Sequence, residues 1–267
     1  MLQRHPFSLT RRWLSVTPLL LAAIVTAIGP LTAPIGVAGA ATGPCAPLPN
    51  FSASNFAHDN GKPADIDNPY FPLEPGMTFV YLGTKDGAQT KNVMRVTHTV
   101  KMIHIDGHVL PTVQVHDLVY VAGKLEEETL DWYAQDRPGN VWYLGEDSTE
   151  IPTGSKAGSW EAGVDGARPG LIMEADPQVR DRYMQEFAPN QGAQDRAEVK
   201  GFVETMTVPY GTFHHVLKTQ EGSCVEAGDE WKFYAAGVGN IRVQSLGHNG
   251  KPDGVEEQDL VSVKHDD

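Results

Sequence analysis

The sequence predicts an all-β protein built mainly from antiparallel strands. Short runs of β-branched and aromatic residues recur between turn signals, apolar and polar residues alternate within several runs, and no segment sustains a helical period. Pairs such as Asp106-Gly107 favour tight hairpins because Asp and Gly accept a positive φ. A single sheet of this length must curl or be covered, since its apolar face would otherwise stay in water. We therefore expect a curled meander that forms a half-barrel or barrel, with a two-sheet sandwich as the alternative.

The expected strands form two sets on either side of a Gly- and Pro-rich excursion at 148–177. The span 176–184 could hold a turn or two of helix. The first set is 77–84, 92–105, 109–120, 125–135 and 141–144. The second set is 182–187, 197–208, 212–219, 230–234, 240–245 and 255–263.

Residues 1–40 have the layout of a secretory signal peptide. A basic leader with Arg4, Arg11 and Arg12 precedes an apolar run at 14–28, and the small residues Ala38-Gly39-Ala40 suit cleavage after Ala40. A retained N-terminal anchor is the alternative, and the adjacent arginines leave Sec and twin-arginine export open. Cleavage would leave a Pro-rich arm at 41–75 and one β-rich domain at 76–267. We expect an exported protein, periplasmic or extracellular, with no integral membrane segment after cleavage.

Charge and cysteine usage agree with export. The chain has a formal net charge of −13, which becomes −16 when the three leader arginines are removed. An acidic protein is repelled by nucleic acid and by anionic membranes, so neither is an expected partner. Cys45 and Cys224 are the only cysteines, and an oxidising compartment favours a disulfide between them.

Alternation within the strands identifies a candidate binding face. Met94, Val96, His98, Val100 and Met102 share one face of their strand. Methionine adapts to irregular apolar ligands, although a filled core has the same composition. Aromatic residues of the next hairpin could add flat apolar contact. The candidate ligand-binding residues are Met94, Val96, Met102, Trp132, Tyr133 and Trp142.

Two groups of residues could support catalysis. A hairpin about Asp106-Gly107 would place Asp117 opposite Val96 and one diagonal step from His98, which makes an inward His–Asp pair possible. Such a pair could act as a base with its orienting acid or as two metal ligands; the alternatives are a buried ion pair and a strand edge where both side chains reach water. The hairpin at 126–147 is rich in carboxylates and aromatics, which sugar hydrolysis needs, but no pair of acids stands out. His98 and Asp117 are therefore only weak catalytic candidates.

Motifs for metals and cofactors are absent from the sequence. It contains no His-Glu-x-x-His, no Cys-x-x-Cys and no Gly-x-Ser-x-Gly. We expect no metal site and no cofactor.

Several phrases together resemble a family of uncharacterised secreted bacterial β-rich proteins. They are Asn68-Pro69-Tyr70-Phe71-Pro72-Leu73, the run from Asp131 to Asp136, the run from Gly139 to Asp147, and Ser159-Trp160-Glu161-Ala162-Gly163-Val164-Asp165-Gly166. The run from Tyr234 to Gly239 is loosely similar to exported half-barrel proteins of the lipoprotein-carrier type. The resemblance implies an exported β fold and no catalytic residue. The expected role is binding of a small apolar molecule or lipid, or a structural role in the envelope; a secreted hydrolase is the alternative.

Overall fold

The computed structural model describes residues 44–59 and 61–266, so the expected leader at 1–40 lies outside the described residues. One 14-stranded sheet, antiparallel throughout, makes up most of the fold, and a short hairpin of β1 (His58–Asp59) and β2 (Lys62–Pro63) lies apart from it. Within the described part of the chain, the 3-10 turn η1 (Ala53–Asn55) is the sole helical element. The prediction of an all-β, antiparallel fold is confirmed.

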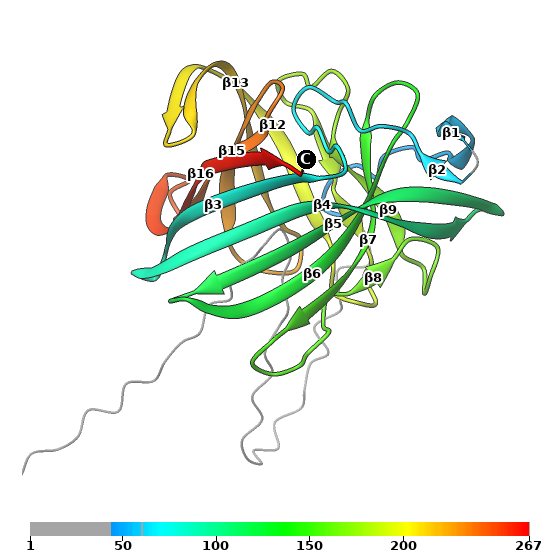
Figure 1. Ribbon diagram of the computed structural model, residues 1–267, viewed down its shortest axis with the longest axis horizontal. Helices are drawn as coiled ribbons and strands as arrows, with labels where there is room; N and C mark the ends of the chain where they lie inside the picture. The colour runs from blue at the N-terminus through cyan, green and yellow to red at the C-terminus, as the bar shows by residue number, and fades with distance from the viewer. Residues whose placement is uncertain (1–43, 60, 267) are drawn as a thin grey trace, which may run out of the picture.

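The chain order and the order in the sheet are closely related. The first set of strands is β3 (Met77–Lys85), β4 (Ala88–Ile105), β5 (His108–Val121), β6 (Lys124–Gln135), β7 (Val141–Glu150), β8 (Trp160–Glu161) and β9 (Arg168–Met173). The second set is β10 (Arg182–Met184), β11 (Glu186–Phe187), β12 (Asp195–Val208), β13 (Gly211–Ser223), β14 (Asp229–Ala235), β15 (Gly239–Leu246) and β16 (Pro252–His265). The last strand, β16, pairs with β3, so the two meanders join into one sheet (Figure 1).

The sheet closes on itself through one short segment. Strand β10 pairs with β12 at one end of the sheet order, and β11 pairs with β9 at the other. Gln185 alone separates β10 from β11 in the chain, so the two ends of the sheet meet in the continuous segment Arg182–Phe187. Because the two ends of the sheet meet in this segment, the fold is a nearly closed barrel rather than a two-sheet sandwich. Closure also leaves few strand edges unpaired.

A glycine permits the close approach at this joint. A Cβ added to Gly170 in β9 would lie 2.3 Å from the carbonyl carbon and oxygen of Gln185 and 2.5 Å from the carbonyl oxygen of Met184. All three contacts are with backbone, which cannot move aside without opening the sheet. Glycine is therefore required at position 170 for steric reasons.

The excursion at 148–177 holds more order than the sequence indicates. It contains the end of β7 and all of β8 and β9, and residues 176–184 contain turns and strand β10 rather than helix. Strand β9 contains Pro169 and Gly170, two residue types with low strand propensity, so the sequence does not predict a strand here. Five consecutive residues of this strand, Pro169–Met173, are buried. A strand covered on both faces has no alternation for a sequence pattern to detect.

Strand β4 carries an irregularity that changes which of its residues face inward. Val96 pairs with Val115 and Val100 with Val113, so four steps along β4 match two along β5. Beyond this β-bulge the buried positions are Ile103 and Ile105. The expectation that Val100 and Met102 face inward is wrong, since their side chains are 37% and 40% exposed. A bulge turns the strand about its axis, and periodicity alone does not reveal it.

The Pro-rich arm packs into the barrel. Phe56, Ile66, Phe71 and Leu73 are buried in the common core, and the Phe71 ring lies edge-on to that of Tyr133 at 5.4 Å between centroids. A buried asparagine, Asn68, fixes the arm by donating from Nδ2 to the carbonyls of Gly139 (2.9 Å) and Glu174 (3.0 Å). These contacts hold residues 71–73 against the inner face of the sheet.

The structure contains the Cys45–Cys224 disulfide, which spans 179 positions. It holds the start of the arm beside the closing segment, where the Pro47 carbonyl accepts a hydrogen bond from the Met184 N–H at 3.0 Å. The cross-link therefore supports the joint between the two ends of the sheet.

Removing the disulfide should destabilise the fold measurably. In the chain-entropy model a loop of this length contributes roughly 4–5 kcal/mol, as an upper value. We expect Cys45→Ser/Cys224→Ser to lose about 2–5 kcal/mol in urea unfolding. Reductant should reproduce the loss in the wild type and have no effect on the double variant. Equal stability of the oxidised wild type and the variant would contradict this role.

A side chain added at the joint should lower the free energy of unfolding, and the loss should be larger where the new Cβ meets backbone atoms. We expect Gly170→Ala to lose about 3 kcal/mol or more, because the new Cβ meets backbone. Gly211→Ala is the matched control, since its nearest contact would be the end of the Phe213 ring at 3.4 Å. Thermal unfolding followed by circular dichroism compares the two. Similar stability of the two variants would show that the joint tolerates a side chain.

Candidate functional site

The barrel interior contains a row of carboxyl groups on neighbouring strands. Asp131 on β6 pairs directly with Glu146 on β7, and both are at least 95% buried. The Tyr143 hydroxyl lies 2.6 Å from Asp131 Oδ1 and 3.1 Å from Glu146 Oε2. One hydroxyl hydrogen donates to one carboxyl oxygen at a time, so the other carboxyl must find a different proton. A proton held by one of the two acids satisfies this pair.

Burial raises the pKa values of these acids. It raises the pKa of Asp131 to about 7 against the partial relief of the Tyr143 hydrogen bond. Burial, with the neighbouring Asp131 carboxyl adding to it, raises the pKa of Glu146 and of Asp117 well above their usual range. Glu127, at the end of the row, has its pKa raised by burial to about 8. The row is therefore largely protonated at mildly acidic pH.

A second buried group is charged and fully paired. Glu221 on β13 accepts hydrogen bonds from four donors, namely Thr219 Oγ1 (2.7 Å), Gln185 Nε2 (2.8 Å), the Tyr234 hydroxyl (2.8 Å) and Lys232 Nζ (3.0 Å). Burial alone would raise the pKa of Glu221, but Lys232 and these donors outweigh it and lower the pKa. Lys232 Nζ also lies 3.0 Å from Glu230 Oε1. The ammonium group is thus shared between two carboxylates.

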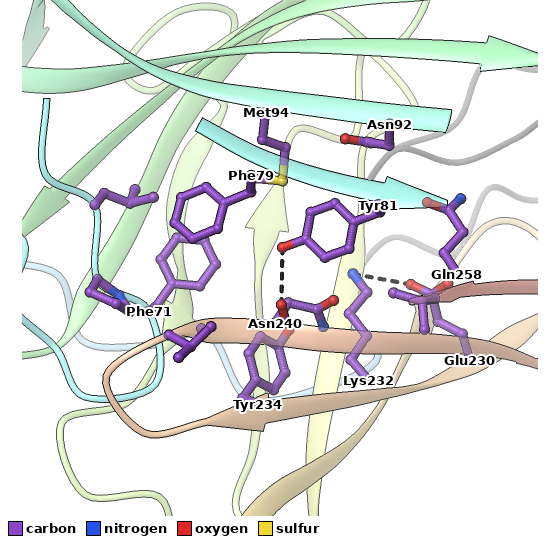
Figure 2. A pocket seen from close by; sticks show the side chains of 15 residues that line it. Phe71, Phe79, Tyr81, Asn92, Met94, Glu230, Lys232, Tyr234, Asn240 and Gln258 are labelled. Carbon is purple, nitrogen blue, oxygen red and sulfur yellow. Dashed lines mark hydrogen bonds and ion pairs between the residues drawn. The ribbon is translucent and has the colours of Figure 1, made fainter. Parts of the chain in front are cut away.

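A pocket opens beside this ion cluster. It holds about 700 Å³ of space, counting its opening to solvent. Its walls come from five adjacent strands, β14, β15, β16, β3 and β4, and from the arm and the turn before β15 (Figure 2). The lining residues are Phe71, Pro72, Leu73, Phe79, Tyr81, Asn92, Met94, Glu230, Lys232, Tyr234, Val238, Gly239, Asn240, Val243 and Gln258.

Strand register divides the pocket into an apolar part and a polar part. Phe79 pairs with Met94 across β3 and β4, and two residues further along β3, Tyr81 pairs with Asn92. Figure 2 shows Phe71, Phe79 and Met94 toward one side, with Asn92 and Lys232 toward the other. The Tyr81 hydroxyl donates to the Asn240 carbonyl at 3.0 Å, which links β3 to β15 across the pocket. The arrangement suits a ligand with an apolar body and one polar end.

The candidate ligand-binding residues of the sequence separate in the structure. Met94 lines the pocket. Val96, Trp132, Tyr133 and Trp142 are buried in the core but are not among the lining residues, and Met102 is on the surface. Trp142 has a structural role, because its Nε1 donates to Asp136 Oδ2 at 2.8 Å and its ring packs edge-on against Phe51.

His98 and Asp117 are not brought together. The bulge in β4 places Asp117 opposite Met94 rather than Val96, and His98 lies exposed within the irregular stretch. Asp117 is 3% exposed, and its Oδ2 accepts from Asn92 Nδ2 at 3.3 Å. The expected geometry of a His–Asp pair is therefore corrected, since a buried acid and an exposed imidazole cannot share a proton directly.

The acidic hairpin divides between the inside and the outside of the barrel. Asp131 and Glu146 point inward, whereas Glu126, Glu128 and Asp147 are partly or largely solvated. Asp136 is buried at the turn and accepts hydrogen bonds from the N–H groups of Gly139 (3.0 Å) and Asn140 (2.8 Å). None of these carboxylates lines the pocket.

Sequence reasoning missed most of the pocket. Phe79 and Tyr81 lie two positions apart on β3, and Lys232 and Tyr234 lie two positions apart on β14. The sequence can therefore show that each pair shares one face of its strand. What unites the pairs is the contact of β16 with β3, which joins the last strand to the first strand of the sheet. A pairing so distant in sequence leaves no local pattern.

Two observations on the described residues concern membrane-spanning helices and clusters of metal-ligating side chains. Across residues 44–59 and 61–266 no helix is long and apolar enough to cross a bilayer. In the same residues, no three His, Cys, Asp or Glu side chains converge in a way that could hold a metal ion.

Comparisons with known proteins give distant structural matches. No family model and no curated protein matches the chain. One similar solved structure, from Bacteroides fragilis NCTC 9343, is described as an exported protein with a YMCC-like fold; it shares 16% identity and a TM-score of 0.42 over 73% of this chain and 98% of that one. Another, described as a lipoprotein of Parabacteroides distasonis ATCC 8503, shares 14% identity and a TM-score of 0.43 over 74% and 99% of the two chains. At identities and TM-scores this low, the matches support no conclusion about function.

Stability should fall as pH rises from about 4 to 8. A buried acid whose folded pKa is raised keeps its proton in the native state after the unfolded state has lost it, so rising pH favours unfolding until the folded pKa is passed. For Asp131, with a folded pKa of about 7, the loss between pH 5 and pH 8 is about 2 to 3 kcal/mol. Asp131→Asn should remove that part of the pH dependence, measured by urea unfolding at the two pH values.

The control for this experiment is Asp65→Asn, which changes an exposed acid. It should leave the pH dependence of the wild type unchanged. A pH profile of Asp131→Asn that matches the wild type would show that Asp131 is ionised in the native state throughout this range.

Proposed function

We propose that this protein is exported and binds a small, largely apolar molecule in the pocket between β14, β15, β16, β3 and β4. The observation that carries the proposal is the joining of an apolar wall to a few polar groups within one pocket. Binding pockets are commonly lined by apolar and aromatic side chains, with a small number of polar groups that orient the ligand. Phe71, Phe79 and Met94 supply the wall, and Asn92 and Lys232 lie at the polar part.

The way the pocket is built favours binding over a filled core. Phe79 and Tyr81 lie on a strand held on both sides, by β16 and β4, so these side chains are positioned before any ligand arrives. A rigid wall reduces the ordering cost of association. The arm residues Phe71 and Leu73 are buried and complete the wall of the same pocket from outside the sheet.

The export part of the proposal is supported by the signal-like residues 1–40, by the disulfide, and by the net negative charge. The hydrolase alternative gains no support from the pocket. Glu230 is its single carboxylate, and this group is engaged with Lys232.

Filling the pocket should abolish binding. We expect Met94→Trp to weaken the binding of the neutral fluorescent probe N-phenyl-1-naphthylamine by about tenfold or more, because the indole occupies the ligand's space. The control is Met102→Trp, on the same strand but with its side chain 40% exposed, which should bind as the wild type does. Fluorescence titration measures both, and native mass spectrometry of the purified wild type should show a co-purifying apolar ligand.

A second filling variant, Val238→Phe, places the added bulk on the turn before β15 and tests the same pocket without altering a strand. Circular dichroism should show that each variant keeps the strand spectrum. Wild-type affinity in both folded variants would contradict the proposed binding site.

A further inference from the structure

The polar part of the pocket carries no net positive charge. Lys232 is the sole cationic residue among the lining residues, and its ammonium group already contacts Glu221 and Glu230 at 3.0 Å each. Glu221 is held ionised by Lys232 and its other donors, and its presence cancels the lysine charge whether Glu230 is ionised or protonated. The cluster is therefore neutral or negative, and it does not attract an anion.

The groups left free at this part are mainly hydrogen-bond acceptors. Asn92 is 7% exposed, and its Oδ1 has no hydrogen-bond partner among the described residues. Its Nδ2 donates to Asp117 Oδ2 at 3.3 Å, and its Oδ1 is buried without a partner. The Tyr81 hydroxyl uses its hydrogen on the Asn240 carbonyl and keeps its lone pairs. A buried acceptor without a partner favours a ligand that brings a donor.

A hydroxyl group fits these groups better than a carboxylate does. The third N–H of Lys232 can donate to a neutral hydroxyl oxygen, and the hydroxyl hydrogen can be donated to Asn92 Oδ1. A carboxylate in the same place would be a further negative group around one ammonium ion, with Asn92 Oδ1 still unpaired. The desolvation of that extra charge would have no compensating cation.

We propose that the pocket selects an apolar molecule that ends in a neutral hydroxyl group and discriminates against one that ends in a carboxylate. This selectivity rests on the proposed binding function. Its physical origin is the pairing of Lys232 with two carboxylates next to an unpaired amide oxygen.

The test compares ligands with identical chains. 1-Dodecanol and dodecanoate should each be titrated at pH 8, below micelle-forming concentrations, against protein loaded with N-phenyl-1-naphthylamine. We expect 1-dodecanol to displace the probe at about tenfold lower concentration than dodecanoate. Equal displacement, stronger displacement by dodecanoate, or displacement by neither overturns the selectivity. Failure of the probe to bind the wild type at all would overturn the proposed binding function as well.

A charge variant tests the cause of the selectivity. Glu230→Gln keeps the shape of the side chain and removes one carboxylate beside Lys232. It should narrow the preference for the alcohol to about threefold or less, mainly through tighter binding of dodecanoate. The control is Glu204→Gln, an exposed position on β12 with the same change in net charge, which should keep the wild-type ratio. A ratio unchanged in both variants would show that the paired lysine does not set the preference.

Discussion

The closing of the sheet at the segment Arg182–Phe187 is the constraint on which the rest of the structure depends. This segment pairs with β12 through one half and with β9 through the other, so the two ends of a long meander are held by one stretch of backbone. Gly170 allows the approach, and the disulfide from Cys45 holds the arm beside it. Closure buries most of the interior side chains, and the raised pKa values of the acids Asp131 and Glu146 follow from that burial.

The buried acids of the interior are stabilised in two different ways. Asp131 and Glu146 lie together, and no cationic side chain among residues 44–59 and 61–266 forms a salt bridge with either. Burial raises the pKa of each, so the pair relies on protons and on the Tyr143 hydroxyl. Glu221 keeps its charge because Lys232 and three neutral donors surround it. A protonated acid needs few partners, whereas a buried carboxylate needs many, and the two arrangements occupy different parts of the barrel wall.

The pocket forms on the side of the ionic arrangement. Its polar groups are therefore already engaged with one another, and this engagement decides what a ligand can contribute. Lys232 would be an anion site if it were alone, but Glu221 and Glu230 cancel that character. In the proposed binding mode, the apolar wall around Phe79 and Met94 would supply contact area, and the unpaired acceptor on Asn92 would favour a ligand that brings a donor. The proposed affinity and the proposed selectivity thus rest on different residues of the pocket.

Local patterns determined the strand class, most strand positions and the hairpins, because turn residues and period-2 alternation act over a few neighbouring residues. They also marked Met94 as a candidate for ligand contact. Only the tertiary structure decided the barrel closure, the bulge that turns Met102 outward, the separation of His98 from Asp117, and the pocket itself. Each of these depends on pairing between strands that are distant in sequence or on local backbone geometry at single residues. Neither kind of feature produces a periodic pattern in the sequence.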